Sequence, residues 1–412
     1  MKQSKSVLED SLQLPNRAII KNRIFKSAMS EALGTNNQNP RESLVTLYKT
    51  WANGGAGLVV TGNVMIDRNA LGEPNNVVVE DERDLDMLMK WAKAGTENET
   101  HLWMQLNHPG KQSPKTISKE PVAPSAVPLS GDLKNFFTPP RALHAKEIEE
   151  IIIRFGKAAR IAKKAGFTGV QIHAAHGYLI SQFLSPHHNQ RTDEWGGSLA
   201  NRMRFLLETY KEIRKQVGET FPIGIKLNSA DFQHGGFTEE ESMEVLQKMS
   251  EIGIDLIEIS GGNYENPKMM VADVKETTKK REAYFIEYAN KARKLVSTPL
   301  VVTGGFRSQE GMEEAIASGE IDMVGMAKPF ALVPDLANKI FQGNYETVQT
   351  KPIRTGIKLV DKTAAMLEIG WYEQQLARIG KSQSPNPNHS VWISLIQNVL
   401  ANGRGVFLRR RG

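Results

Sequence analysis

The chain of 412 residues contains no cysteine. Disulfides, thiolate-bound iron–sulfur clusters, cysteine-ligated zinc and a cysteine nucleophile are therefore excluded. Long apolar runs are missing too, since none approaches the ~18 residues of a membrane span. The polar start, Met1 to Lys5, leads into Val7-Leu8-Glu9-Asp10 and has no apolar signal core. We expect a cytoplasmic protein without a membrane segment, in which any redox chemistry uses a group other than a thiol.

The remaining composition is that of an ordinary soluble globular protein. Hydrophobic residues make up 40% and charged residues 24%, enough to bury a sizeable core. A net charge of +6 permits an acidic ligand or nucleic acid but requires neither. The concentrated basic run Arg409-Arg410-Arg411 is typical of a solvated tail. We expect a small-molecule substrate, no nucleic-acid partner and a possible homo-oligomer.

From about residue 20, short apolar runs alternate with amphipathic stretches. Apolar residues at three- and four-residue spacing in the latter, such as Ile148, Ile151, Ile152 and Phe155, predict helices that cover a sheet on one face. The predicted strands are Arg23–Met29, Gly57–Thr61, His101–Leu106, Gly169–Ala174, Ile223–Asn228, Leu256–Ser260, Pro299–Thr303 and Met323–Met326. The predicted helices are Arg41–Asn53, Glu82–Glu97, Lys146–Ala165, Leu199–Val217, Glu239–Ile252, Glu282–Val296, Gln309–Ser318 and Pro334–Phe341.

This alternation predicts the fold class. Continuously apolar strands such as Leu300-Val301-Val302 are typical of a parallel sheet buried on both faces. Eight such strand–helix units predict an α/β fold, the (β/α)8 TIM barrel, over residues 1–345. The alternation stops after about Tyr345, and helices predicted over Leu359–Ile379 and Val391–Leu400 make residues 346–412 a mainly helical C-terminal extension.

Two connections are longer than a barrel needs. Asn107–Leu143 carries seven prolines and follows the third strand, and Gly177–Ser198 follows the fourth. A loop of the first length in a compact domain usually forms a lid or a binding surface. Active sites of TIM barrels lie at the carboxyl ends of the strands, so both loops are predicted to border the active site.

Chemistry is concentrated at the end of the fourth strand, in Ile172-His173-Ala174-Ala175-His176-Gly177-Tyr178. Two imidazoles and a phenol fall within six positions where the chain leaves a strand and enters a glycine turn. A pair of hydrogen-bonded core histidines beside a packed tyrosine is the structural alternative. The ends of strands seven and eight carry Gly304, Gly305 and Lys328, which can seat a phosphate because backbone amides approach an anion closely where no Cβ intervenes.

These separated motifs resemble the old yellow enzyme family, the FMN-dependent NADH:flavin oxidoreductases and ene-reductases, over roughly residues 15–345. His173-x-x-His176-Gly177-Tyr178 is the most specific motif, together with Ser185-Pro186 and with Arg191 to Ser198. The resemblance also rests on Asn22-Arg23-Ile24-Phe25-Lys26-Ser27-Ala28-Met29, Gly55-Ala56-Gly57-Leu58-Val59-Val60 and Gln105-Leu106-Asn107-His108-Pro109-Gly110.

The resemblance implies FMN as cofactor, NADH or NADPH as reductant and an enone-like substrate. By position, Tyr178 would be the proton donor, and His173 and His176 would hydrogen-bond the substrate carbonyl oxygen. Two imidazole donors at that oxygen would stabilise the negative charge that develops there. The implied cofactor-binding residues are Ser27, Ala28, Met29 and Ser30 along the isoalloxazine edge, Asn63, Gln105 at the pyrimidine, Lys226 at N1 and O2, and Gly304, Gly305, Ala327 and Lys328 at the phosphate. No metal site is implied.

Several positions depart from the family's pattern. Many members carry arginine where this chain has Lys226 and Lys328, and a lysine offers a point charge in place of a bidentate fork. Proline is common at Ala28, cysteine or threonine at Ser30, and a small residue at Asn63. These departures concern phosphate affinity and flavin reactivity.

Three alternatives stay open. A flavoenzyme resembling tRNA dihydrouridine synthases would suit the basic charge, although that class uses a cysteine proton donor. A metal-dependent barrel hydrolase could use His173 and His176 with Asp231 and His234. A non-catalytic flavoprotein would bind the same cofactor without being reduced by nicotinamide.

Overall fold

The computed structural model describes residues 5–262, 285–349, 352–357 and 364–402. Eight parallel strands close into a barrel, because β3 pairs with β4 on one side and with β13 on the other. In chain order these strands are β3 (Ile24–Lys26), β4 (Leu58–Met65), β6 (His101–Asn107), β9 (Gly169–Ala174), β10 (Ile223–Asn228), β11 (Leu256–Ser260), β12 (Leu300–Thr303) and β13 (Met323–Met326). The predicted TIM barrel is confirmed.

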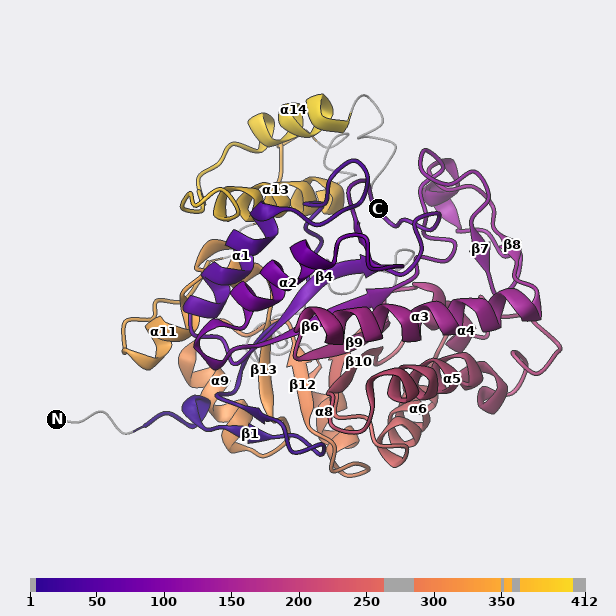
Figure 1. Ribbon diagram of the computed structural model, residues 1–412, viewed down its shortest axis with the longest axis horizontal. Coiled ribbons are helices and arrows are strands. Elements are labelled where there is room, and N and C mark those ends of the chain that lie inside the picture. Colours follow the sequence, from indigo (N-terminus) through magenta and orange to yellow (C-terminus); the bar gives the residue numbers. More distant parts are fainter. Residues whose placement is uncertain (1–4, 263–284, 350–351, 358–363, 403–412) are drawn as a thin grey trace.

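Helices surround this barrel (Figure 1). They are α1 (Glu42–Asn53), α2 (Leu85–Gly95), α3 (Ala145–Ala165), α4 (Leu179–Leu184), α5 (Leu199–Val217), α6 (Glu239–Glu251), α8 (Ile286–Arg293), α9 (Gln309–Ala317), α10 (Lys328–Leu332) and α11 (Leu336–Phe341). Local signals set several of these boundaries. Thr238 caps α6 by accepting from the Glu241 amide at 3.2 Å, while Gly166 ends α3 at a φ of 95°.

Some predicted boundaries were wrong. The connection Gly177–Ser198 is not a plain loop, because it contains α4, whose six residues are all buried. The predicted helix Pro334–Phe341 is α11, and the short helix α10 before it was not predicted. The strand predicted over Arg23–Met29 spans only Ile24–Lys26. Residues 282–284 of one predicted helix and 359–363 of another lie outside the described residues.

The barrel interior is divided into an apolar floor and a polar layer above it. The floor is a cluster closed from below by residues of the N-terminal hairpin β1 (Leu12–Gln13) and β2 (Ile19–Ile20), and it consists of Leu12, Leu14, Ile20, Phe25, Leu58, Val60, Trp103, Leu256, Val301 and Met323. Alternation along each strand then places polar side chains one step higher, as Glu258 follows Leu256 and Thr303 follows Val301. Water is thus excluded below the site.

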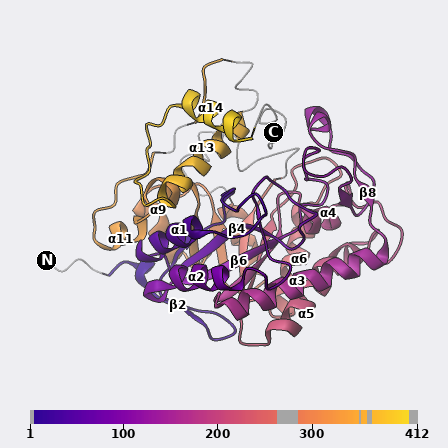
Figure 2. The same ribbon diagram turned by 45° about the horizontal axis from the view of Figure 1, so that its top comes forward.

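The C-terminal helices α13 (Ala364–Ile379) and α14 (Val391–Asn402) lie at the opposite end of the barrel from β1 (Figures 1 and 2). Helix α13 contacts α1 and α10, and its Leu367, Trp371 and Leu376 join the main hydrophobic core. The extension therefore packs on the barrel, on the side where the strands end. A domain boundary at residues 345 and 346 stays a prediction. Within the described ranges, none of the helices combines the length and apolarity of a membrane span.

Candidate active site

A buried carboxylate occupies the centre of the polar layer. Glu258 on β11 is fully buried, and its Oε1 lies 3.0 Å from the Lys226 ammonium of β10. Thr303 donates to the same oxygen at 2.7 Å, and the Ser27 hydroxyl donates to it as well. Lys226 also donates to the Ser27 oxygen at 3.2 Å. Burial of this charge is tolerated because the opposite charge and the hydroxyl donors surround it.

Two amides extend this network toward the third strand. Gln171 on β9 donates to Glu258 Oε2 at 2.8 Å, and Gln105 on β6 donates to the Gln171 side-chain oxygen at 2.7 Å. Gln105 and Lys226, which the resemblance assigns to the flavin pyrimidine and to N1 and O2, therefore belong to a single hydrogen-bonded row. Such a connected row holds each side chain in one position.

The histidine–tyrosine motif begins at the level of this layer and continues past the end of β9. His173 is the register partner of Lys226 on β10, and its ring centroid is 5.2 Å from that of His176 and 4.8 Å from that of Tyr178. The Ala175 amide donates to His173 Nδ1 at 3.3 Å. In a neutral imidazole that accepts at Nδ1, the proton is on Nε2, so His173 is prepared to donate from Nε2.

His176 is held by its backbone and by its ring. Its φ of 61° is left-handed, and its amide donates to the Asn228 side-chain oxygen at 3.1 Å while its carbonyl accepts from Gln112 at 2.9 Å. Its Nε2 lies 2.6 Å from the Ser260 hydroxyl. A substrate oxygen that used this nitrogen would have to replace Ser260.

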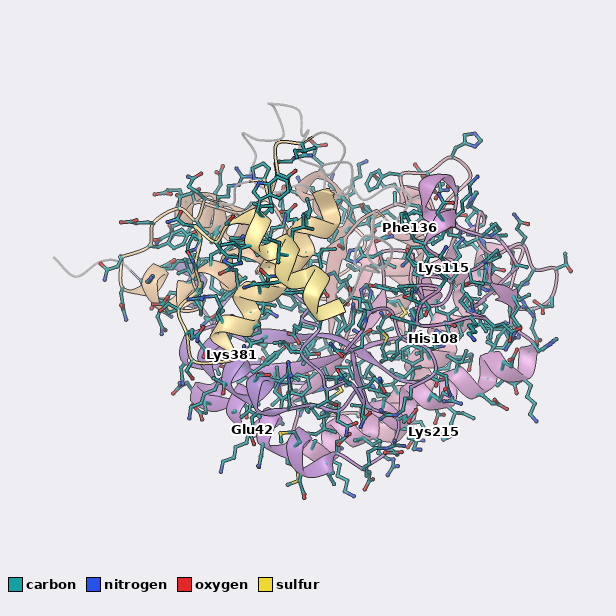
Figure 3. The ribbon with its side chains drawn as sticks, turned by 90° about the horizontal axis from the view of Figure 1, so that it is seen from above. Glu42, His108, Lys115, Phe136, Lys215 and Lys381 are labelled. Carbon is teal, nitrogen blue, oxygen red and sulfur yellow. The ribbon has the colours of Figure 1, made fainter. Side chains whose placement is uncertain are left out.

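Tyr178 lies under the proline-rich connection after β6. It is 1% exposed and packs in a cluster with Leu129, Leu133 and Phe137 of that connection. Figure 3 shows Phe136 and Lys115 of this connection on one side of the catalytic face, with the C-terminal helices on the other. The connection thus covers the proposed proton donor, as expected for a lid.

Asn63 on β4 contacts this phenol. Its side-chain amide donates to the Tyr178 hydroxyl oxygen at 3.3 Å, and its own oxygen accepts from Asn107 at 3.4 Å. The resemblance places Asn63 among the cofactor-binding residues, and the structure adds that it touches the proposed acid.

The segment after β3 places Ser27 inside the polar layer and Ser30 beside two carboxylates. The Ser30 hydroxyl lies within hydrogen-bonding distance of Glu73, in the connection after β4, and 2.8 Å from Glu373 of α13, and its single proton can be donated to one of them at a time. Both acids are buried. Ala28 packs against the apolar floor, and Met29 packs against the main core. The four residues thus contact four different surroundings within one short segment.

The predicted phosphate residues come together where strands seven and eight end. Gly304 and Gly305 have φ values of 106° and 94°, which favour glycine and leave no Cβ in the way of an anion. Ala327 precedes Lys328, the first residue of α10. The Lys328 ammonium lies 2.5 Å from the Glu368 carboxylate of α13, and its side chain is 37% exposed.

A second buried cation lies behind the first strand. Lys26 has its ammonium 3.9 Å from the Trp51 ring centroid and 4.0 Å from Glu31. Burial lowers the pKa of Lys26 to about 8, against the opposing effect of Glu31, and the nearby Lys226 lowers it further. Burial also raises the pKa of Glu31. This pair packs between β3 and α1 and forms a support for the site.

Sequence reasoning missed several polar partners. Glu258 and Gln171 were detectable in principle, as charged and amide residues at inward positions of apolar strands. Nothing in the sequence indicated Glu368 and Glu373, because their contacts depend on where α13 packs.

One residue of the metal alternative, Asp231, makes hydrogen bonds within the protein: its carboxylate accepts from the Phe237 amide at 3.1 Å and from the Asn228 side chain at 3.3 Å. Throughout the described ranges no group of three or more histidine and acidic residues is arranged to hold a metal ion.

The residues present fit FMN at three points. Positive-φ glycines and Lys328 offer an anion seat, and Lys226 with Gln105 offers a cation and an amide for a polar ring edge. His173, which is in register with Lys226, offers an imidazole close to Tyr178. The carboxylates of Glu258 and Glu368 are the features that a bound flavin would have to accommodate, since each already pairs with a lysine.

Comparison with known proteins identifies the family. Residues 12–347 match the family model described as NADH:flavin oxidoreductase / NADH oxidase. The chain is 38% identical over 353 residues to an NADH-dependent flavin oxidoreductase of Neonectria sp., covering 79% of this chain and 45% of that protein. It is 37% identical to one of Hypocrea jecorina, covering 79% of this chain and 86% of that protein. A cinnamate reductase of Clostridium sporogenes is 30% identical, with 85% of this chain and 55% of that protein covered.

Two solved structures agree. A 2-naphthoyl-CoA reductase in complex with 2-naphthoyl-CoA matches with a TM-score of 0.76 and 31% identity, over 82% of this chain and 52% of that chain. An old yellow enzyme homologue from Zymomonas mobilis matches with a TM-score of 0.69 and 26% identity, over 83% of this chain and 94% of that chain. The chain therefore belongs to the NADH:flavin oxidoreductase / NADH oxidase family, whose members are FMN-dependent oxidoreductases.

Proposed function

We propose that the protein is an ene-reductase, which reduces the activated carbon–carbon double bond of a small α,β-unsaturated carbonyl compound at the expense of NADH or NADPH. The observation that carries this proposal is the grouping of His173, His176 and Tyr178, with ring centroids of His173 and Tyr178 4.8 Å apart and with His173 in register with Lys226. Relatives named as reductases of cinnamate and of 2-naphthoyl-CoA support an unsaturated acyl substrate. A cytoplasmic location and a homo-oligomer stay predictions.

Each residue then has a defined task. His173 donates from Nε2 to the substrate carbonyl oxygen, and this hydrogen bond strengthens as negative charge develops there. His176 supplies a second donor when the substrate oxygen replaces Ser260. FMN, when bound, carries the hydride between nicotinamide and substrate. Its ring would be surrounded by Lys226, Gln105, Ser27, Ala28, Met29, Ser30 and Asn63. Its phosphate would be held by Gly304, Gly305, Ala327 and Lys328.

Tyr178 completes the reaction by giving a proton to the substrate α-carbon. The phenol hydroxyl is an O–H donor. Burial under Leu129, Leu133 and Phe137 keeps water away from this proton, and Asn63 holds the oxygen in place. Asn63 uses the phenol oxygen as an acceptor, so this contact does not take up the phenol proton.

An anaerobic half-reaction experiment tests the proposal. The purified holoprotein is reduced with NADH or NADPH, and the loss of flavin absorbance near ~450 nm is followed. The reduced protein is then mixed with enones, nitroalkenes and dienoyl thioesters. We expect the absorbance to return with at least one alkene. A flavin that nicotinamide does not bleach would indicate a non-catalytic flavoprotein, and a reduced flavin reoxidised only by oxygen would exclude the ene-reductase.

A further inference from the structure

Helix α13 reaches both parts of the proposed flavin site from the C-terminal extension. Its Glu368 carboxylate lies 2.5 Å from the Lys328 ammonium, and five residues later Glu373 accepts from Ser30 at 2.8 Å. The ring of Tyr372, one turn after Glu368, has its centroid 5.7 Å from the same Lys328 nitrogen. One helix outside the barrel therefore contacts the phosphate lysine and the rim of the isoalloxazine site.

The charges at Lys328 set up a competition. A phosphate carries up to two negative charges, and Glu368 already pairs with the lysine that would bind it. The Glu368 side chain is only 16% exposed, so solvent screens its charge poorly. One ammonium between two anions leaves them repelling each other at short range.

We propose that Glu368 competes with the phosphate of FMN for Lys328, so that α13 sets the affinity for the phosphorylated flavin. The inference rests on the proposed function, because it takes Lys328 as the phosphate ligand. Linkage makes the effect reciprocal: if the Glu368–Lys328 pair disfavours phosphate, then phosphate weakens the pair. Binding of FMN accordingly loosens the attachment of α13 near Glu368.

The test compares FMN with riboflavin, which has the same ring system but no phosphate. The full-length chain, stripped of flavin, is titrated with each, and binding is read from the quenching of flavin fluorescence. Glu368→Gln should tighten the binding of FMN by about fivefold or more, which is the low end of typical coupling between two sites, and leave the affinity for riboflavin unchanged. Glu368→Asp, which retains the charge on a shorter side chain, should fall between wild type and Glu368→Gln.

Two further variants keep the outcome interpretable. Glu208→Gln removes the same charge from α5, where Glu208 pairs with Lys211 at 2.8 Å on the surface, and should leave both affinities unchanged. Lys328→Met should weaken the binding of FMN and leave the binding of riboflavin unchanged. The inference is overturned if the ratio of FMN affinity to riboflavin affinity is the same in Glu368→Gln as in wild type, or lower. If Lys328→Met leaves FMN binding unchanged, the proposed phosphate role itself is wrong, which distinguishes the two failures.

Discussion

Lys226 and Glu258 are register partners on neighbouring strands, and their charged atoms lie 3.0 Å apart inside the barrel. A lone cation at this position would attract electrons onto a nearby flavin ring, whereas the pair carries no net charge. The carboxylate therefore moderates the lysine that the resemblance places at N1 and O2.

Removing the moderating charge should raise the flavin reduction potential. We expect Glu258→Gln to shift the midpoint potential upward by on the order of 30 mV, which for a two-electron couple corresponds to about 1.4 kcal/mol. Lys226→Met should shift it downward. The potential is measured by equilibration with a reference dye, and Glu208→Gln serves as the charge control. A downward shift in Glu258→Gln would contradict this role.

Replacing the phenol should separate the two half-reactions. Tyr178→Phe keeps the ring that packs on Leu129, Leu133 and Phe137 but removes the acidic proton. We expect reoxidation by an enone to slow by about 100-fold or more, the usual contribution of general acid catalysis, while reduction by nicotinamide stays unchanged. Anaerobic stopped-flow absorbance measures both rates. Equal losses in both half-reactions would argue against proton donation.

Asn63 should act through Tyr178. Asn63→Ala removes the donor 3.3 Å from the phenol oxygen and should slow reoxidation several-fold, or about 10-fold at most, because a neutral hydrogen bond contributes only about 1 kcal/mol. Asn63→Asp should be slower still, since a carboxylate would accept the phenol proton and direct it away from the substrate. The pH profile of reoxidation separates this role from a structural one. As a control, both Asn63 substitutions are repeated in the Tyr178→Phe background, where we expect neither to change the reoxidation rate further.

His108 should make the protein sensitive to mild acid. Burial lowers the pKa of His108 to about 4, against the opposing effect of Asp67. Its folded pKa lies below the ordinary value of about 6.5, so between these two values the unfolded chain binds more protons and stability falls as pH falls. We expect a loss of about 3 kcal/mol from this group between pH 6.5 and pH 4.

The matched variant is His108→Asn, whose side-chain oxygen can still accept from the Gly110 amide, as His108 Nδ1 does at 3.1 Å. Urea unfolding at several pH values should show a shallower loss for this variant than for wild type. His188, whose pKa burial and Lys111 also lower, accounts for part of the remaining slope. Parallel stability curves for wild type and variant would show that His108 does not titrate in this way.

The parts of the fold that depend on local pattern were predictable. Strands such as β9 and β10 have the predicted bounds, because a short apolar run between two capped helices is typical of a buried strand. The motif His173 to Tyr178 could be placed at the end of β9 for the same reason. Roles could be inferred only through the family resemblance, and the assigned site residues stay predictions.

The rest depends on contacts between segments far apart in the chain. Ser30 and Glu373 are separated by 343 positions, and only the docking of α13 brings them together. Helix α4 was missed because its six residues are buried throughout and show no amphipathic period. The hydrogen-bonded row from Gln105 to Glu258 could not be predicted either, because its members lie on different strands that become neighbours only in the closed barrel.

The apolar floor formed with the N-terminal hairpin has a kinetic consequence. Among the described residues, Leu12, Leu14 and Ile20 close the barrel from below, so a ligand is expected to approach Lys226 from the strand-end side. A nicotinamide and an alkene that both need the same face must then take turns, each leaving before the next arrives. Double-reciprocal plots at several fixed concentrations of the second substrate should accordingly give parallel lines, the mark of ping-pong turnover.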